Sequence, residues 1–503
     1  MIATGVVVCF ALLGCVWGQA HNSFPEGFMF GAATAAYQVE GAWNTSAGSG
    51  SAGKGESIWD RFVHNVPDCI ANHQTGDVAA DSYHLYPQDI QALKDVGFGH
   101  YRFSISWPRV MPTGDVTDIN QDGIDYYNKL IDALLADNIT PMVTMYHWDL
   151  PQSLQDLGGW TNPIMVDYFE DYARVLYDNF GDRVKWWITF NEPLTFVAGY
   201  TSGGCTPPQV NAPDVGNYLV AHTVIKSHAR AYHLYDDNYR DSQKGQVGIT
   251  LNTGWFLAAN GTEQELQLAE YTMQSTLGWF AHPIYSKEGD YPAILKETIA
   301  NQSRAEGRYR SRLPEFDEYW INYIRGSADF LGLNHYGSTV LSAGDGGVQT
   351  LIDPSWPKSS ATWLLYTPFG MRPLLNWMKQ EYDNSTIIIT ENGWGDEGEL
   401  NDTVRSNYYL SYLAGVVEAI NLDNVNVIGH TSWSIIDNFE WASGFTIKFG
   451  LYSVDYDDAS RPRTPKASAG VLADIISSNQ IPEEIFEALH ADPYYQMYYP
   501  LSD

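Results

Sequence analysis

The sequence is poor in basic residues and in cysteine, and both shortages exclude classes of protein. Only 28 of its 503 residues are Lys or Arg, against 60 Asp or Glu, so the formal net charge is −32. A surface that neutralises nucleic-acid phosphates or anionic lipid headgroups needs the opposite balance. With only four cysteines, a disulfide-rich scaffold is excluded and a cysteine metal site is not indicated. We expect no nucleic-acid or membrane partner, no metal and no organic cofactor.

Long hydrophobic runs are absent except at the N-terminus. Residues 1–20 carry no charged side chain, and the apolar run 2–17 ends in small residues near Gly18 and Ala20. A membrane anchor is the alternative, but the run is shorter than the ~20 residues that a spanning helix needs. We interpret residues 1–20 as a removed signal peptide and 21–503 as the mature domain. Since the C-terminus matches no retention signal, we expect secretion to the extracellular space or a gut lumen, with a lysosome-like compartment as the alternative.

Two further features suit an exported protein. Two of the four cysteines lie within the signal, and the mature chain keeps Cys69 and Cys205. An oxidising compartment would allow these two to pair, although the sequence leaves free thiols equally open. Asparagine also occurs in Asn-x-Ser/Thr glycosylation triplets, and our five candidate acceptors are Asn44, Asn260, Asn301, Asn384 and Asn401. A sixth triplet, at Asn138, directly precedes a strand-like run and is the weakest.

Short strand-like runs alternate with longer helical segments along the chain. At 44% hydrophobic and 17% charged residues, the composition is that of a folded globular protein. Amphipathic spacing predicts helices, for example over 123–135 and 167–180. The eight strand-like runs are 28–38, 101–107, 141–148, 184–192, 246–251, 330–336, 386–391 and 425–433. This alternation predicts an α/β fold with a single (β/α)8 barrel, and a long loop over 341–367.

Two of the predicted strands end in a glutamate. The fourth run ends in WITFNEP, which contains Glu192, and the seventh ends in ITENG, which contains Glu391. Barrel enzymes place their chemistry where the C-terminal ends of the strands meet. A single strand-end glutamate is more often a helix cap or an ion-pair partner, because an unpaired buried carboxylate is costly. Two carboxylates at one pocket, however, are the arrangement that glycoside hydrolysis requires.

A series of longer motifs accompanies the two glutamates. FMFGAATAAYQVEGAW, YRFSISWPR, MVTMYHWDLPQ, WITFNEP, NHY, ITENG and SWSIIDNFEWASGF follow one another between residues 24 and 465. By these motifs the chain resembles the glycoside hydrolase family 1 β-glucosidases of the animal, particularly insect, type, a group that includes myrosinase-like members. The resemblance implies a retaining β-glycosidase that hydrolyses unphosphorylated β-D-glucosides, with galactosides and fucosides as further substrates.

The resemblance also implies roles for individual residues. Glu192 would be the general acid/base and Glu391 the nucleophile. While Glu391 is ionised, a second negative charge nearby is disfavoured, so Glu192 keeps its proton; once Glu391 is esterified, the pKa of Glu192 falls. Arg102 would keep Glu391 ionised, and Tyr336 would donate a hydrogen bond to it.

Sugar recognition requires neutral hydrogen-bonding groups and flat apolar faces. By resemblance, the substrate-binding residues are Gln38, His147, Asn191, Tyr336, Trp433, Glu440 and Trp441. Asn191 would face the 2-hydroxyl, where contacts strengthen in the transition state, and the carboxylate of Glu440 would repel a 6-phosphate. The walls of the aglycone pocket would be Trp148, Trp363 and Phe449.

Two other functions stay open at this point. One is an insect thioglucosidase acting on glucosinolates, whose sulfate favours a cation near the aglycone. The corresponding positions look like Ala198 and Thr339, which are uncharged, although Lys358 or Arg372 could supply the charge. The other is a non-catalytic sugar-binding protein on the same barrel, which the presence of both glutamates disfavours, since such relatives typically lose one.

Overall fold

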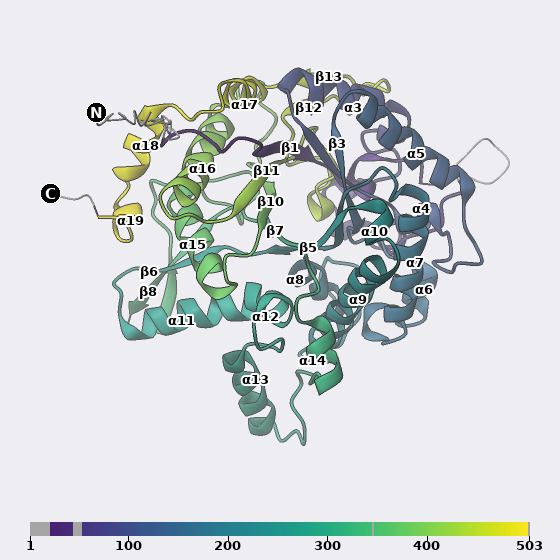
Figure 1. Cartoon of the computed structure of the whole chain (residues 1–503), viewed down its shortest axis with the longest axis horizontal. Coiled ribbons are helices and arrows are strands. Elements are labelled where there is room, and N and C mark those ends of the chain that lie inside the picture. The colour runs from purple at the N-terminus through teal and green to yellow at the C-terminus, as the bar shows by residue number, and fades with distance from the viewer. Residues whose placement is uncertain (1–20, 44–52, 345–346, 501–503) are drawn as a thin grey trace, which may run out of the picture.

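The structure is a computed structural model that describes residues 21–43, 53–344 and 347–500 (Figure 1). Its centre is a closed barrel of parallel strands in the order β1-β11-β10-β7-β5-β4-β3-β2. These strands are β1 (Met29–Ala33), β2 (His100–Ser104), β3 (Thr140–Tyr146), β4 (Trp186–Asn191), β5 (Gln246–Asn252), β7 (Phe330–Asn334), β10 (Ile387–Asn392) and β11 (Val427–Trp433). Each of the eight overlaps one predicted run, so the predicted (β/α)8 barrel is confirmed.

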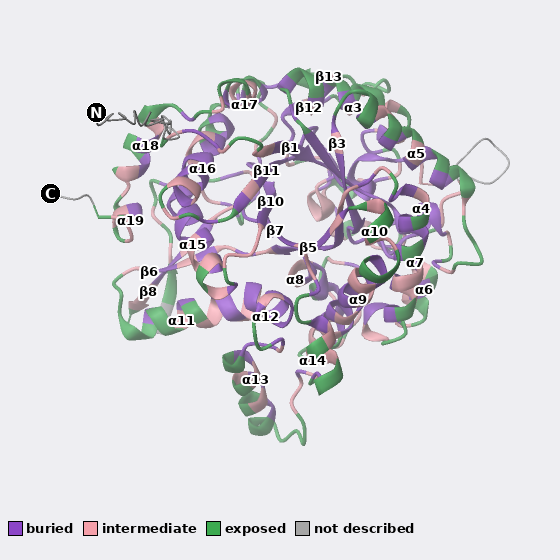
Figure 2. Cartoon of the chain, viewed as in Figure 1, coloured by how far each residue is buried: buried purple, intermediate pink, exposed green. Residues whose placement is uncertain are grey.

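Helices surround the barrel (Figure 1), and many of them are buried along one part and exposed along another (Figure 2). The predicted helices over 123–135 and 167–180 are α5 (Gln121–Ala136) and α7 (Met165–Phe180). On α7 the buried residues Phe169, Tyr172 and Leu176 follow the helical period of three to four residues. This periodicity places one face of α7 against the core and the opposite face in solvent.

The remaining helices connect the strands or cover the ends of the barrel. Before β4 these are α1 (Ala36–Val39), α2 (Ile58–Asn65), α3 (Ser82–Val96), α4 (Trp107–Val110) and α6 (Gln152–Asp156). Between β4 and β7 they are α8 (Pro193–Phe196), α9 (Gly216–Asn238), α10 (Arg240–Gln243), α11 (Glu263–Met273), α12 (Trp279–Tyr285), α13 (Ala293–Ala305) and α14 (Glu318–Ile324). After β7 they are α15 (Met371–Glu381), α16 (Thr403–Asn421), α17 (Ala467–Ser478), α18 (Glu483–His490) and α19 (Pro493–Gln496).

The first predicted strand is too long. Strand β1 ends at Ala33, and α1 then carries Gln38 away from the barrel. At this turn the backbone N–H of Ala36 donates to the Ser104 hydroxyl at 2.7 Å and not to a backbone carbonyl of a neighbouring strand. The run 28–38 therefore contains a strand and a helical turn that are both buried, and burial hides the boundary from hydrophobic periodicity.

The predicted long loop over 341–367 is wrong in its first part. Strands β8 (Ser338–Gly344) and β9 (Gly347–Leu351) pair antiparallel, and β8 also pairs in parallel with β6 (Trp255–Ala258). A second small sheet joins β12 (Tyr452–Val454) to β13 (Arg463–Pro465). These strands are short and depend on partners distant in the chain, so their local sequence carries a weak signal.

Cys69 and Cys205 form a disulfide bridge. The sulfurs of Cys69 and Cys205 lie 2.14 Å apart, at a sequence separation of 136. Cys69 closes a short 3-10 turn that follows α2, and Cys205 lies in the loop between α8 and α9. The bridge therefore joins two loops at the C-terminal face of the barrel.

The predicted signal and one predicted glycosylation site, Asn44, lie outside the described residues. Asn260, Asn301 and Asn401 are exposed. Asn384 is half-buried, and its amide donates to the carbonyl of Asn424 at 3.2 Å. Within 21–43, 53–344 and 347–500, no helix has the length and apolar character needed to cross a bilayer.

Candidate active site

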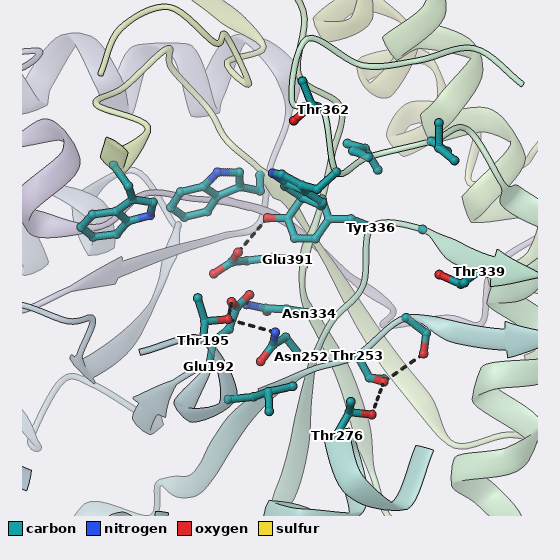
Figure 3. Close-up of a pocket in the computed structure, with 18 of the residues that line it drawn as sticks. Glu192, Thr195, Asn252, Thr253, Thr276, Asn334, Tyr336, Thr339, Thr362 and Glu391 are labelled. Atoms are coloured by element: carbon teal, nitrogen blue, oxygen red, sulfur yellow. Dashed lines mark hydrogen bonds between the residues drawn. The ribbon is translucent and has the colours of Figure 1, made fainter. Parts of the chain in front are cut away.

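A cavity of about 840 Å³ opens at the C-terminal face of the barrel. Glu192 and Glu391 both line it, and they approach it from β4 and β10 (Figure 3). The two strands deliver their glutamates to one space because their C-terminal ends meet at the same edge of the barrel. The volume lies at the upper end of the range for small-molecule sites, so it exceeds what one sugar ring fills.

Glu192 occupies the turn between β4 and α8. Its backbone is left-handed, with φ of 48°, an uncommon conformation for a residue with a side chain. Asn334 Nδ2 donates to Oε1 at 2.7 Å, and the Thr195 hydroxyl donates to Oε2 at 2.8 Å. Burial, followed by the charge of Glu391, raises the pKa of Glu192 to about 7. At neutral pH this carboxyl group is therefore poised to give or take a proton.

Glu391 is held by a cation and a phenol. Arg102 donates to Oε1 at 2.7 Å, and the Tyr336 hydroxyl donates to Oε2 at 2.7 Å. Burial and the charge of Glu391 raise the pKa of Tyr336 well above its usual value, so the phenol keeps its proton and remains a donor. Arg102 is 1% exposed and also donates to Asn191 Oδ1 at 2.6 Å. Both oxygens of Glu391 are thereby fixed in orientation.

His147 stands beside Asn191 as a neutral imidazole. Asn191 Nδ2 donates to His147 Nε2 at 3.0 Å, which leaves the ring proton on Nδ1. Burial and the nearby Arg102 lower the pKa of His147 well below its usual value. Within the described residues, the buried Nδ1 has no hydrogen-bond partner, so the imidazole keeps a donor available for a ligand.

Aromatic rings and Glu440 form another wall of the cavity. The ring centroids of Trp148 and Trp441 lie 4.4 Å apart, and those of His147 and Trp433 lie 5.8 Å apart. Burial, followed by the charge of Glu391, raises the pKa of Glu440 to about 8. This wall combines flat apolar faces with a group that can donate as well as accept a hydrogen bond.

Two of the predicted residues, Arg102 and Gln38, are not among the residues that line the cavity. Arg102 bonds Glu391 and Asn191, which do line it. Gln38 is fully buried, and its amide donates to the carbonyl of Phe439 at 2.9 Å and lies 3.5 Å from Glu440 Oε2. Gln38 thus supports the segment that carries Glu440.

The three predicted aglycone residues all line the cavity. Trp148 and Phe449 are buried, whereas Trp363 is 64% exposed. The ring of Trp363 meets that of Tyr336 edge-on at 5.4 Å. Trp363 therefore lies at the solvent side of the cavity, next to a residue that contacts Glu391.

Sequence reasoning missed three polar residues around Glu192. Asn334 and Thr195 contact its carboxylate, and Asn252 contacts Thr195 at 3.1 Å. Asn334 ends β7 and belongs to the NHY motif, so its strand-end position was a usable signal. Thr195 and Asn252 carry no such signal, because a threonine in a helical turn or an asparagine at a strand end is common. In the part of the chain that is described, no group of three His, Cys, Asp or Glu side chains could hold a metal ion.

Comparisons with known proteins point to one family. The profile described as Glycosyl hydrolase family 1 matches residues 20–481. "Myrosinase 1" of Brevicoryne brassicae is 44% identical, covering 91% of this chain and 99% of that protein. Human "Cytosolic beta-glucosidase" is 41% identical over 91% of this chain and 98% of that protein. Human "Lactase/phlorizin hydrolase" is 47% identical over 92% of this chain, which spans only 24% of that protein.

Solved structures agree with the sequence comparisons. An aphid myrosinase superimposes with a TM-score of 0.86 at 44% identity, covering 91% of this chain and all of the other. A rice β-glucosidase superimposes with a TM-score of 0.83 at 37% identity, covering 90% of this chain and 99% of the other.

Proposed function

Because this chain belongs to glycosyl hydrolase family 1 and is β-glucosidase-like, we propose that it hydrolyses unphosphorylated β-D-glucosides with Glu391 as nucleophile and Glu192 as acid/base. The observation that carries the proposal is the different environment of the two carboxyl groups. Glu391 receives a guanidinium and a phenol, whereas Glu192 is buried beside another negative charge and has a pKa of about 7. Two carboxyl groups in unequal environments divide into a proton donor and a nucleophile.

In the first step Glu391 attacks the anomeric carbon and forms a glycosyl ester, while Glu192 transfers its proton to the leaving oxygen. The geometry suits this step because Arg102 and Tyr336 hold the attacking carboxylate. Esterification removes the charge of Glu391, which is one of the two causes that raise the pKa of Glu192.

In the second step Glu192 has lost its proton, and its lowered pKa keeps it ionised and therefore free to act as the base. It takes a proton from water, the water oxygen attacks the anomeric carbon, and the ester bond to Glu391 breaks. Two displacements at one carbon give a product with the configuration of the substrate.

Recognition of the sugar is assigned to the neutral donors and the aromatic wall. His147 Nδ1 has no hydrogen-bond partner among the residues that the structure describes, Asn191 sits between Arg102 and His147, and Trp433 and Trp441 offer flat faces. A 6-phosphate is disfavoured beside Glu440, because the negative charge of Glu391 already acts on this part of the cavity and a phosphate dianion would add to it. The substrate partner is thus a neutral glycoside or a short oligosaccharide.

A mechanism-based label tests the proposal. A 2-deoxy-2-fluoro glucoside with an activated leaving group should trap the ester, and digestion should place the mass increase on the peptide that contains Glu391. Proton NMR of early hydrolysis products should show the β-anomer before mutarotation. A label on another peptide, or an initial α-anomer, would contradict the assignment.

A second candidate function is hydrolysis of glycosides with an anionic aglycone, including thioglucosides. Lys358 lines the cavity and is its only Lys or Arg among the described lining residues. Its side chain is exposed to solvent. Arg372, the other cation considered, instead pairs with Asp423 at 2.6 Å. The similarity to a protein named myrosinase gives this candidate further support.

We also propose that the enzyme is an exported glycoprotein. The proposal is supported by the apolar residues 1–20, by the Cys69–Cys205 bridge, since disulfides persist in oxidising compartments, and by three exposed glycosylation triplets. N-terminal sequencing of protein exported from eukaryotic cells, and its mass before and after removal of N-glycans, test it.

A further inference from the structure

Glu192 accepts two hydrogen bonds, and only one of the two donors can change its role. The donor to Oε1 is an amide N–H of Asn334, and the donor to Oε2 is the hydroxyl of Thr195. An amide N–H only donates, whereas a hydroxyl donates or accepts according to how it rotates. The stability of the Glu192 carboxylate therefore depends on the direction of one hydroxyl hydrogen.

The position of Thr195 is set by the turn that carries Glu192. Thr195 follows Glu192 by three residues in the one-turn helix α8, and its backbone N–H donates to the Glu192 carbonyl at 2.9 Å. This local bond holds Thr195 over the glutamate, and its side chain lies on the cavity wall beside Oε2 (Figure 3).

Asn252 sets the direction of the hydroxyl. It ends β5 and donates from Nδ2 to Thr195 Oγ1 at 3.1 Å. With that lone pair of Oγ1 occupied, the hydrogen of Thr195 is directed to Glu192. The chain of bonds runs from the Asn252 amide through Thr195 to the carboxylate.

We propose that Thr195 and Asn252 are positioning residues for the acid/base: Asn252 directs the Thr195 hydroxyl, and the hydroxyl holds the Glu192 carboxylate from the side opposite Asn334. The inference rests on the proposed role of Glu192. Neither residue needs to touch the reacting atoms of the substrate.

Other charged and titratable groups also face this part of the site. They are Glu391 on β10, Arg102 on β2, Tyr336 after β7 and Glu440 after β11. Burial and Glu391 raise the pKa of Glu192, and the hydrogen bonds from Asn334 and Thr195 lower it. Loss of the Thr195 hydroxyl therefore favours the protonated form of Glu192 and extends it to higher pH.

The experiment is the pH profile of kcat/KM, whose alkaline limb reports the essential acid of the free enzyme. Thr195→Val should move that limb upward by roughly one pH unit, as expected for loss of one hydrogen bond to a charged group. Thr195→Ser keeps the hydroxyl and should restore the parent limb. Thr276→Val is the matched control, because its hydroxyl lines the same cavity but donates to the carbonyl of Thr272; its limb should stay in place.

The variant Asn252→Leu tests whether Asn252 acts on Glu192 through Thr195 or independently of it. It should move the limb in the same direction as Thr195→Val but less, and the double variant should move it no further than Thr195→Val alone. If the limb shift of the double variant equalled the sum of the two single shifts, Asn252 and Thr195 would act independently and not as one chain of hydrogen bonds, because the effects of independent contacts add. An unmoved limb in Thr195→Val, or equal shifts in the Val and Ser variants, would overturn the proposal.

Glu192→Ala separates this inference from the proposed function. If Glu192 is the acid/base, the variant should lose the alkaline limb and keep activity only on activated leaving groups, with azide restoring turnover. Should the limb persist in Glu192→Ala, the role of Glu192 is wrong. If the alkaline limb vanishes in Glu192→Ala but keeps its parent position in Thr195→Val, only the role of Thr195 and Asn252 is wrong.

Discussion

Arg102 connects the two halves of the site at the scale of single residues. Its guanidinium bonds Glu391 on β10, Asn191 on β4 and the Thr144 hydroxyl on β3. Because it is buried, each of these bonds forms in a region where water competes little. One side chain therefore orients both the proposed nucleophile and a residue that adjoins the proposed acid/base.

A prediction for a single residue concerns Lys358, the lysine that lines the cavity. If it recognises an anionic aglycone, Lys358→Met should raise KM for a carboxylate- or sulfate-bearing glucoside by about tenfold, as expected for about 1.4 kcal/mol of lost binding. KM for a neutral aryl glucoside of similar size should change little, because that aglycone has no charge to pair. Steady-state kinetics of matched substrate pairs measure the difference.

Two controls sharpen this measurement. Added salt should weaken the parent enzyme's preference for the anionic substrate, because a charge pair at an exposed lysine is screened, and should leave Lys358→Met unaffected. Lys358→Arg retains the charge and should retain most of the preference. Equal effects of Lys358→Met on both substrates would show that the lysine does not select charge.

At the scale of elements, the loops beyond the strand ends shape the cavity. The sheet β6-β8-β9 contributes Phe256, Thr339 and Leu351 to its lining. The loop between α8 and α9 contributes Cys205, which is tied to Cys69 after α2. The barrel thus carries the proposed catalytic groups, and under the proposed function we expect these outer segments to select the aglycone.

The double variant Cys69→Ser, Cys205→Ser should be less stable than the parent. A bridge across 136 residues restricts the unfolded chain by up to about 5 kcal/mol in the chain-entropy account. Calorimetry or denaturant unfolding should show a lower unfolding midpoint. In steady-state kinetics, KM for glucosides with bulky aglycones should rise, whereas kcat for small aryl glucosides should change less.

Reduction provides the control for the bridge. Dithiothreitol should lower the unfolding midpoint of the parent toward that of the double variant and leave the variant unchanged. A parent midpoint that does not respond to reduction under unfolding conditions would contradict a stabilising bridge.

At the scale of the whole molecule, acidity affects stability as well as partners. A net charge of −32 gives solubility but also internal repulsion, which grows as carboxyl groups ionise. Inside the fold, burial raises the pKa of Asp149 to about 8. A carboxyl group whose folded pKa lies above its unfolded value stabilises the folded state at low pH, and this contribution is lost as pH rises toward the folded pKa.

Asp149→Asn tests this effect. In the parent, the unfolding midpoint should fall between pH 5 and pH 8, because Asp149 ionises more readily in the unfolded chain. In Asp149→Asn the midpoint should fall less over this pH range. The difference between the unfolding midpoints of variant and parent should therefore favour the variant more at pH 8 than at pH 5. Thermal unfolding across this pH range measures both.

Salt separates the buried group from the surface. Added salt screens repulsion between exposed carboxylates and should raise the midpoint of parent and variant alike, while the difference between them remains. An identical pH dependence of parent and variant would show that Asp149 ionises equally in both states.

Much of the fold and the centre of the site could be predicted from the sequence. Strand-like runs alternating with helical segments determined the barrel, because connection handedness leaves few alternatives. The placement of Glu192 and Glu391 at strand ends determined that both reach one rim, since parallel strands end at the same edge. Residue motifs around them indicated the family, which the comparisons confirmed.

Only the tertiary structure decided the contacts between distant segments. It brought Asn334 to Glu192 and Asn252 to Thr195 from other strands, joined Cys69 to Cys205, and paired β6 with β8. It also separated Lys358, which reaches the cavity, from Arg372, which does not. The reason is physical: periodicity along a chain fixes which face a residue takes, whereas its partners depend on how separate elements pack.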